Sequence, residues 1–326
     1  MSKYRGRLPQ LGDVLFLTDG GLETTLIFHE GVALPHFAAF DLLKSEEGTA
    51  VLRRYFERYV QLALAQETGL VLETPTWRAN PDWGAKLGYD TAGLAEANRR
   101  SVGLLLEIRQ ALEAPRTPIV ISGNLGPRGD GYVPGARMTA AAAAEYHSPQ
   151  LKTFAGTDAD MAAALTMNYP EEAIGIALAA RAAGLPVAIS FTTETDGRLP
   201  SGDTLEEAIA RTDEASDAYP VYYMINCAHP THLEDALTQE GPWRERIRGL
   251  RANASRRSHA ELDESADLDM GDPEELGAQY RELRATLRRL CVVGGCCGTD
   301  HRHVEAIGRA LLAVAATPRP VGSARR

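Results

Sequence analysis

The sequence predicts an α/β protein folded as one closed (β/α)8 barrel of the TIM type. Short apolar segments alternate with amphipathic helical segments along most of the 326-residue chain. Eight such strand and helix units can be counted, which is the number that closes a parallel barrel. Two cysteine motifs directly follow the sixth and the eighth predicted strand. Both motifs are therefore expected on the rim where the active sites of such barrels lie.

The predicted strands are short apolar runs that end at glycine, proline or polar residues. One of them contains Ala162, Ala163 and Ala164, which favour helix by intrinsic propensity, and its place in the alternation decides for a strand. The predicted strands span residues 13–18, 70–74, 118–122, 160–166, 186–191, 221–226, 247–253 and 290–293.

Helices are predicted between these strands. Ser45 is a favourable N-cap before apolar residues at helical spacing, and Pro170 opens a helix that runs to Ala183. The other predicted helices span 92–112, 139–154, 205–218, 230–239, 273–289 and 301–316, and the charged stretch 255–272 is predicted as an exposed loop. Residues 1–12 are expected to form an N-terminal extension, 13–316 the single barrel domain, and 317–326 a loose C-terminal tail.

Composition narrows the classes of function. A formal net charge of −10 argues against a nucleic-acid-binding surface, and no apolar run approaches the ~18 residues that a membrane span needs. The amino terminus lacks the apolar region of a secretory signal, so a cytoplasmic protein is expected, with no nucleic-acid or membrane partner. In that reducing compartment the four cysteines are expected as thiols, and Cys291, inside an apolar run, as a core residue.

The other three cysteines form a candidate metal site. Cys296 and Cys297 are neighbours within a cluster of glycines, which lets the backbone aim both side chains at one point. Cys227 directly follows the sixth strand, which a single strand separates from the eighth in the barrel, so its side chain can converge with theirs. Three thiolates with a fourth position open to substrate or water are the ligand set of a catalytic zinc. A disulfide between Cys227 and one of the pair is the alternative, which a reducing cytoplasm disfavours.

The chain contains the motifs Asp19-Gly20-Gly21 and Asn226-Cys227 and the segment 294–299. Together with the segments 123–127 and 145–147, they resemble the homocysteine S-methyltransferase family, which includes betaine-dependent and S-methylmethionine-dependent enzymes. The resemblance runs from about Asp13 to Ala316. It implies a (β/α)8 barrel, a Zn2+ ion bound by Cys227, Cys296 and Cys297, and methyl transfer from a small onium donor to a thiol.

The chemistry agrees with that ligand set. Coordination to zinc deprotonates a thiol, and three thiolate ligands leave the bound sulfur electron-rich enough to attack a methyl group on a cationic sulfur or nitrogen. The resemblance implies homocysteine as acceptor, methionine biosynthesis as context, and S-methylmethionine, S-adenosylmethionine or betaine as the type of donor. Both partners are thus small molecules, and the sequence leaves a homo-oligomer open.

The resemblance also implies contacts to the amino-acid end of the acceptor. Asp19 and Gly20 match an Asp-Gly pair of the first strand that makes such contacts in the family. A glutamate is expected at the end of the fourth strand, but this chain has Leu165 there. An isobutyl group cannot pair with an α-ammonium group. Glu23 is expected either to supply the missing charge or to act as the first-turn acid of a helix.

Four further residues on the rim are expected near the substrates. Thr74 and Trp77 follow the second strand, and the Trp77 ring would either face a cationic methyl donor or close the barrel mouth by packing. Asn226 ends the sixth strand beside the first cysteine. Asn253 ends the seventh strand and would hydrogen-bond substrate or its own loop. His229 is expected to cap the segment at the following proline or to face solvent, rather than to bind metal.

Two alternatives to this function follow from the same residues. Leu165 favours an acceptor other than homocysteine, either another small thiol or a selenol. A non-catalytic zinc or redox sensor on the same scaffold would form a reversible disulfide at Cys227, whereas an enzyme would lose zinc and activity when Cys296 becomes serine.

Overall fold

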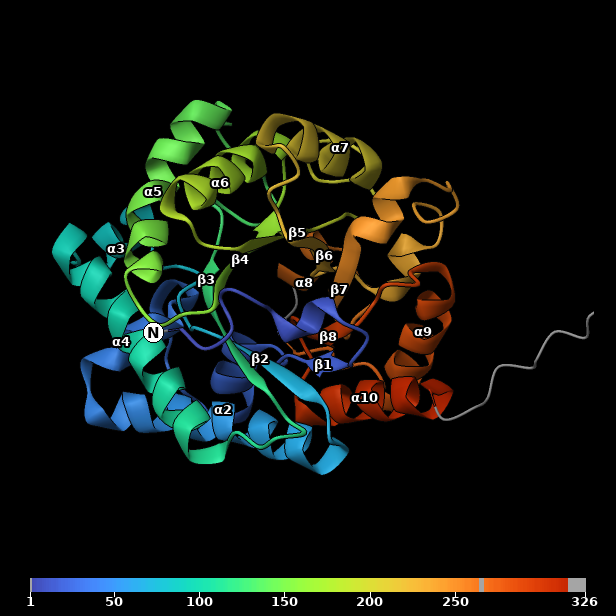
Figure 1. Ribbon diagram of the computed structural model, residues 1–326, viewed down its shortest axis with the longest axis horizontal. Coiled ribbons are helices and arrows are strands. Elements are labelled where there is room, and N and C mark those ends of the chain that lie inside the picture. Colours follow the sequence, from blue (N-terminus) through green and yellow to red (C-terminus); the bar gives the residue numbers. More distant parts are fainter. Residues whose placement is uncertain (1, 264–266, 316–326) are drawn as a thin grey trace, which may run out of the picture.

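The computed structural model confirms the barrel (Figure 1). It describes residues 2–263 and 267–315, so the predicted tail at 317–326 lies outside the described residues. Parallel strands follow one another around the barrel in sequence order, and the last strand pairs with the first. The strands are β1 (Phe16–Leu17), β2 (Gly69–Glu73), β3 (Ile119–Leu125), β4 (Met161–Met167), β5 (Val187–Phe191), β6 (Tyr222–Asn226), β7 (Ile247–Ala252) and β8 (Val292–Gly295).

The first strand is shorter than predicted. Only Phe16 and Leu17 pair with β2 and β8, whereas Val14 is 53% exposed and lies before the paired segment. The predicted strand 13–18 is therefore wrong at its start, because its first residues have no neighbouring strand to cover them. The alanine-rich β4 is a strand as predicted, and each of its residues is buried.

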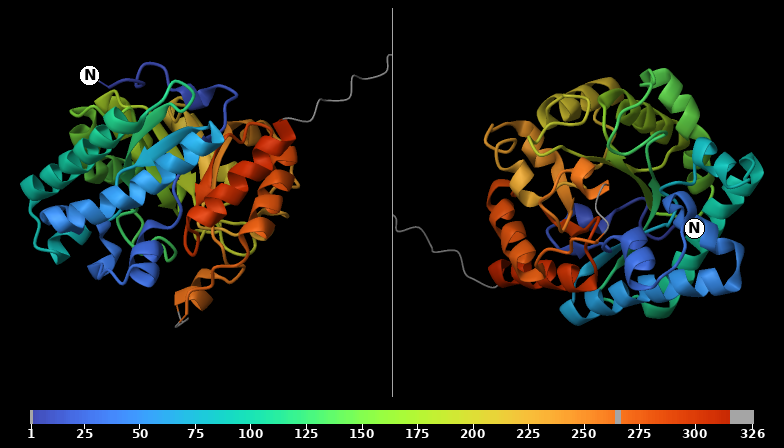
Figure 2. Two further views of the ribbon diagram at one scale, coloured as in Figure 1. Left: turned by 90° about the horizontal axis from the view of Figure 1, so that it is seen from below. Right: turned by 180° about the vertical axis from the view of Figure 1, so that it is seen from behind.

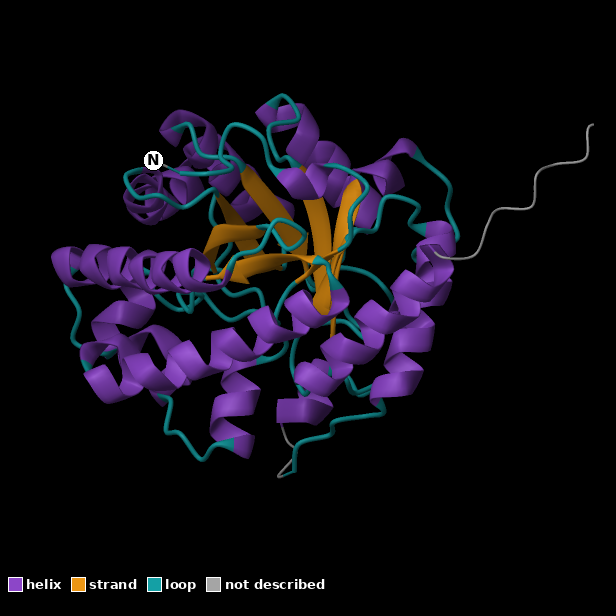
Figure 3. Ribbon diagram, turned by 60° about the horizontal axis from the view of Figure 1, so that its bottom comes forward, coloured by secondary structure: helices purple, strands orange, loops and turns teal. Residues whose placement is uncertain are grey.

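Helices surround the strands on the outside of the barrel (Figure 3). Ser45 caps the first long helix as predicted, since its hydroxyl accepts a hydrogen bond from the Gly48 N–H at 3.0 Å. The long helices are α2 (Glu46–Gln66), α4 (Thr91–Leu112), α5 (Ala140–Ala155), α6 (Pro170–Ala183), α7 (Leu205–Ser216), α9 (Pro273–Thr286) and α10 (His301–Ala315). Short helices are α1 (Leu22–Thr24), α3 (Pro81–Lys86) and α8 (His259–Asp263). No helix in the described part of the chain is long and apolar enough to cross a membrane.

Two connections differ from the prediction. The expected helix at 230–239 is only a 3-10 turn at Pro230–Leu233, and a second 3-10 turn at Pro242–Arg246 leads into β7. Leu233 and Leu237 lie in this short connection, and both side chains are buried. The connection therefore covers the barrel there without a full helix. The expected exposed loop 255–272 also contains α8, whose His259 is only 9% exposed and stacks on the Tyr132 ring.

The N-terminal extension and α8 lie at opposite ends of the barrel (Figure 2). At the first end, the Tyr4 N–H donates to the Asp160 carboxylate at 2.7 Å, and the Arg5 guanidinium donates to the Ala159 carbonyl at 2.7 Å. These contacts attach the extension to the start of β4. The carboxyl ends of the strands point toward the other end, so the extension leaves that rim open for a site.

Candidate active site and metal centre

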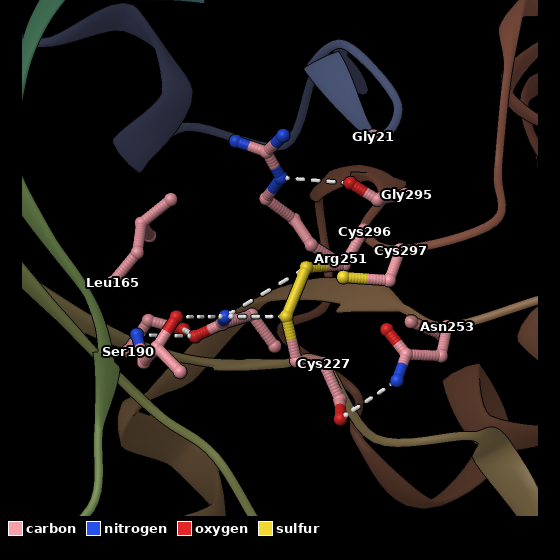
Figure 4. Close-up of a disulfide and its surroundings, with 12 residues drawn as sticks. Gly21, Leu165, Ser190, Cys227, Arg251, Asn253, Gly295, Cys296 and Cys297 are labelled. Atoms are coloured by element: carbon pink, nitrogen blue, oxygen red, sulfur yellow. Dashed lines mark hydrogen bonds between the residues drawn. A yellow bond between two sulfur atoms is a disulfide. The ribbon is translucent and has the colours of Figure 1, made fainter. Parts of the chain in front are cut away.

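The three predicted cysteine ligands meet at the carboxyl-end rim. Cys227 follows β6, Cys296 and Cys297 follow β8, and their Sγ atoms lie within 4.8 Å of one another. Within residues 2–263 and 267–315, no other group of three or more His, Cys, Asp or Glu side chains is close enough to share an ion. The structure joins Cys227 and Cys296 by a disulfide, with Cys297 beside it (Figure 4).

This disulfide corrects the expectation that all four cysteines are thiols. The same proximity that lets three sulfurs share one ion also brings two of them within bonding distance, and the pairing is the alternative considered from the sequence. Cys291 is a buried core residue, as predicted. Its thiol donates to the Gln10 carbonyl at 3.3 Å, and burial raises its pKa.

Backbone conformation sets the positions of the sulfurs. Cys227 has a φ of 55°, which turns its side chain across the end of β6 toward β8. Gly298, with a φ of 77°, provides the left-handed turn that follows the cysteine pair. Gly21 lies so close to β8 that an added Cβ would come within 2.6 Å of the Cys296 carbonyl oxygen. The glycines of both motifs therefore serve close packing around the sulfurs.

Asn226 connects the sulfurs to β4 and β5. Its Oδ1 accepts hydrogen bonds from the Ser190 hydroxyl at 2.6 Å and from the Thr166 N–H at 2.8 Å. Its Nδ2 donates to the Thr166 hydroxyl at 2.9 Å and lies 3.3 Å from the Cys227 Sγ and 4.0 Å from the Cys296 Sγ. Because protein groups already bond to both ends of the amide, Asn226 is placed to orient the two sulfurs.

A buried cluster of charges lies at the same rim, and no sequence motif indicates it. The Arg251 guanidinium donates to the Asp19 carboxylate at 2.5 Å and forms a second ion pair with Glu73. Tyr55 donates to Asp19 at 3.0 Å. Burial raises the pKa of both carboxyl groups, that of Glu73 to about 7, although the charge of Arg251 acts in the opposite direction on each of them. In Figure 4 the Arg251 guanidinium is turned away from the sulfurs.

Glu23 and Arg78 carry two further charges near this cluster. Glu23 lies in the first turn of α1, as the sequence allowed, and burial raises the pKa of its carboxyl to about 7, with the charge of Asp19 adding to the effect. Arg78 is only 7% exposed, and burial lowers the pKa of its guanidinium. Neither belongs to an ion pair among the residues that the structure describes.

The loop after β3 closes over the sulfurs, which the sequence did not predict. The Tyr132 hydroxyl lies 3.7 Å from the Cys297 Sγ, and the Tyr132 ring stacks on His259 with centroids 3.9 Å apart. Burial lowers the pKa of His259 to about 4, so this imidazole is neutral at physiological pH. No sequence motif marks Tyr132. The only sequence feature that could have suggested a role at the site is its place in the glycine-rich connection after a barrel strand.

The remaining predicted residues lie around the same opening. Thr74 bonds to the Thr76 hydroxyl at 2.6 Å, and the Trp77 indole N–H donates to the Leu165 carbonyl at 3.4 Å. Trp77 and Leu165 pack in one apolar cluster inside the barrel, and Figure 4 shows Leu165 across the opening from the cysteines. Asn253 donates to the Cys227 carbonyl at 3.1 Å, and its buried Oδ1 has no partner among the described residues. That oxygen can accept a hydrogen bond from a ligand.

Two predicted residues have backbone or capping roles. The Gly20 carbonyl accepts hydrogen bonds from Tyr55 at 3.1 Å and from Arg251 at 3.3 Å, so this glycine belongs to the charge cluster. His229 caps the 3-10 turn after β6, where its Nδ1 accepts from the Thr231 N–H at 3.3 Å. Of the two roles expected for His229, capping and facing solvent, this geometry gives the capping role.

A closed parallel barrel with three sulfurs converging on its rim defines a class of enzymes that act on thiols, and comparison with known proteins gives the family. The family model described as homocysteine S-methyltransferase matches residues 16–311. The chain belongs to this family, and it is a methyltransferase. A similar protein is homocysteine S-methyltransferase 4 of Zea mays, 24% identical over 317 residues that cover 90% of this chain and 89% of that one.

Solved structures agree on the fold. The metallated form of the homocysteine methyltransferase MmuM from Escherichia coli is similar with a TM-score of 0.68 and 18% identity, covering 94% of this chain and 99% of that one. The oxidised form of the same enzyme gives a TM-score of 0.71 and 20% identity, with the same coverage. At this level of identity the likeness concerns the barrel, and the details of the site come from the residues of this chain.

Proposed function

We propose that the protein is a zinc-dependent S-methyltransferase that moves a methyl group from a small onium donor to a thiol, homocysteine in the first instance, with methionine as product. The observation that carries this proposal is the convergence of three cysteine sulfurs on the rim of a barrel from a methyltransferase family. The thiols need a reducing compartment to remain available as ligands, which favours the cytoplasm.

The residues present fit a zinc ion. Cys227, Cys296 and Cys297 offer three sulfur atoms within 4.8 Å of one another, and thiolates are preferred zinc ligands. When bound, zinc supplies a deprotonated acceptor thiol that remains electron-rich. The side chains around it have their own tasks: Asn226 places N–H donors beside two sulfurs, and Leu165 and Trp77 give the opening an apolar wall that excludes water.

Two observations support the alternatives. Asp19 is already paired with Arg251, and Leu165 carries no charge, so neither is set to receive the ammonium group of homocysteine; this favours a different small thiol or a selenol as acceptor. The disulfide between Cys227 and Cys296 favours a redox sensor on the same scaffold.

Metal analysis combined with a turnover assay tests the proposal. The protein is reduced, loaded with zinc and assayed with homocysteine and other small thiols against S-methylmethionine, S-adenosylmethionine and betaine. Replacement of Cys296 or Cys297 by serine should abolish zinc retention. Turnover should fall by more than about 100-fold, the upper loss typical of residues that only support a metal ligand. Cys291→Ser is the matched control, since this cysteine lies in the core away from the rim, and it should retain both zinc and activity.

The outcomes separate the candidates. Methyl transfer to another thiol or a selenol, but not to homocysteine, would select the alternative acceptor. Zinc-replete protein that transfers no methyl group, yet forms its disulfide reversibly, would select the sensor. Full activity in the absence of zinc would refute the proposal.

A further inference from the structure

We propose that Arg78 and Glu23 form the subsite that binds the carboxylate and ammonium groups of an α-amino-acid thiol, in place of Asp19 and the residue at position 165. This inference rests on the proposed function, because it names how the acceptor of that reaction is recognised. It assigns the specificity of the site to two residues whose charges are not used elsewhere in the described structure.

Arg78 is a buried cation with no acid at ion-pair distance among the described residues, although the nearby charge of Asp130 acts on it. Its guanidinium lies between two indole rings, 4.1 Å from the centroid of Trp77 and 3.8 Å from that of Trp83, and it donates to the Gly129 carbonyl at 3.0 Å. Its Nε is buried and has no hydrogen-bond partner among the described residues. The aromatic sandwich fixes the plane of the guanidinium, which is the geometry that presents paired N–H donors to a carboxylate.

Other buried arginines of the chain do have acidic partners. Arg109, 6% exposed, pairs with Asp160 at 2.6 Å, and Arg251, also 6% exposed, pairs with Asp19 and Glu73. A buried charge is costly unless it is paired and hydrogen-bonded. Arg78 departs from this pattern at the rim where substrates are expected, so a carboxylate of the ligand is the partner that completes its environment.

Glu23 is the complementary acid. Asp19 is engaged by Arg251 and Tyr55, which leaves Glu23 as the acidic group near the cluster that has no cationic partner within ion-pair distance in the described structure. Burial raises the pKa of Glu23 to about 7, and the arrival of a cation beside it would favour its ionised form. An α-ammonium group is such a cation.

Neighbouring residues connect both groups to the segment that carries the sulfurs. Glu23 is next to Thr24, whose hydroxyl accepts from the Gly298 N–H at 3.4 Å, directly after the cysteine pair. Arg78 is held by the loop after β3, which also carries Tyr132 at 3.7 Å from the Cys297 Sγ. Arg78 and Glu23 affect each other's pKa, yet no ion pair joins them in the described structure. A zwitterionic head between them would satisfy both charges while its thiol reaches the sulfurs.

A binding experiment with three thiols tests the inference without a methyl donor. The ligands are homocysteine, its deaminated analogue (a mercaptobutanoate) and its decarboxylated analogue (a mercaptopropylamine). The reduced protein is loaded with Co2+, and each thiol is titrated by following the thiolate-to-cobalt absorption. Metal content is measured in every variant, so loss of metal is distinguished from loss of thiol binding.

The expected result is a reciprocal pattern. Arg78→Met should weaken homocysteine and the mercaptobutanoate by about 10- to 100-fold, as for a lost charge-assisted hydrogen bond, and leave the mercaptopropylamine unchanged. Glu23→Gln should weaken homocysteine and the mercaptopropylamine to a similar extent and leave the mercaptobutanoate unchanged. Arg78→Lys keeps the charge without the planar fork and should give an intermediate loss. Arg128→Met, at an exposed arginine of the loop after β3, is the matched control and should bind all three thiols as the parent does.

Several outcomes would overturn the inference. If Arg78→Met weakens all three thiols equally, the residue has a structural role only. If the loss appears only in turnover, and disappears with a sulfonium donor that lacks a carboxylate, Arg78 binds the donor and not the acceptor. If the metal-loaded parent protein binds none of the thiols, the proposed function fails and this inference with it. If the parent binds homocysteine while both variants keep its affinity, the proposed function stands and only the subsite is wrong.

Discussion

Replacement of Arg251 by methionine should be one of the most destabilising changes in the barrel. The guanidinium holds the carboxylates of Asp19 and Glu73, and all three side chains are at most 7% exposed. Removing one partner of a buried ion pair costs about 3–5 kcal/mol, because the charge left behind has neither water nor counterion. Here two carboxylates are left behind, so the upper part of that range is expected.

The cost should depend on pH in a defined direction. Burial gives Glu73 a folded-state pKa of about 7, above its unfolded value, so its ionisation destabilises the folded protein as pH rises. Below about pH 7 the Glu73 carboxyl is protonated in both the parent and the variant, so loss of the Arg251 charge costs little at this residue. Above that value only the parent can hold the ionised group favourably. The stability difference between parent and variant should therefore widen from about pH 6 to about pH 8.

Urea unfolding followed by tryptophan fluorescence measures this difference. A triple variant with Asp19→Asn, Glu73→Gln and Arg251→Met carries no charge in the cluster and should recover much of the lost stability, since buried polar groups cost less than buried charges. A loss below about 1 kcal/mol at high pH, in the range of an exposed pair, would refute this account of the cluster. An Arg251→Met protein whose deficit shrinks as pH rises would refute the sign.

Three further predictions concern neighbouring elements. Asn226→Ala should lower zinc affinity by about 10- to 100-fold in a chelator competition, as for other residues that orient a metal ligand, while Ser190→Ala should have a smaller effect because it touches no sulfur. Tyr132→Phe removes the hydroxyl beside Cys297 but keeps the ring stacked on His259, so thermal stability should change little, whereas a Tyr132→Ala variant should become more sensitive to proteolysis in the β3 loop. Although burial opposes ionisation of Asp300, hydrogen bonds from His303 and Arg302 lower its pKa, so Asp300→Asn should be destabilising above about pH 4 in urea unfolding, and the deficit should close as pH falls further.

The barrel was predictable because its strands are buried on both faces. Parallel barrel strands therefore appear in the sequence as continuous apolar runs, and even the alanine-rich β4 was found from its place in the alternation. The connection 230–239 was not predicted correctly, because its leucines Leu233 and Leu237 are buried by a 3-10 turn at Pro230–Leu233 and the segment that follows it, without a full helix. Periodicity alone does not distinguish these two solutions.

The site was predicted only where its residues share a motif. Cys227, Cys296 and Cys297 carry a recognisable spacing relative to strand ends, and their convergence followed from the barrel. The partners of Arg251 lie 178 and 232 residues away in the chain, so nothing near it in the sequence indicated a charge cluster. The disulfide is an alternative that only the expected reducing compartment disfavours, and the compartment is a property of the cell and not of the polypeptide geometry.

The pairing of the last strand with the first has a consequence for biosynthesis. Phe16 pairs with Val292, and the two disulfide-linked cysteines are 69 positions apart. A nascent chain that has not yet released β8 from the ribosome lacks two of the three sulfurs and also the strand that seals the cylinder. Under the proposed function, an ion could be bound by all three sulfurs only after β8 and the cysteines that follow it have left the ribosome, and a chain that stops before β8 could neither close the barrel nor supply three sulfur ligands.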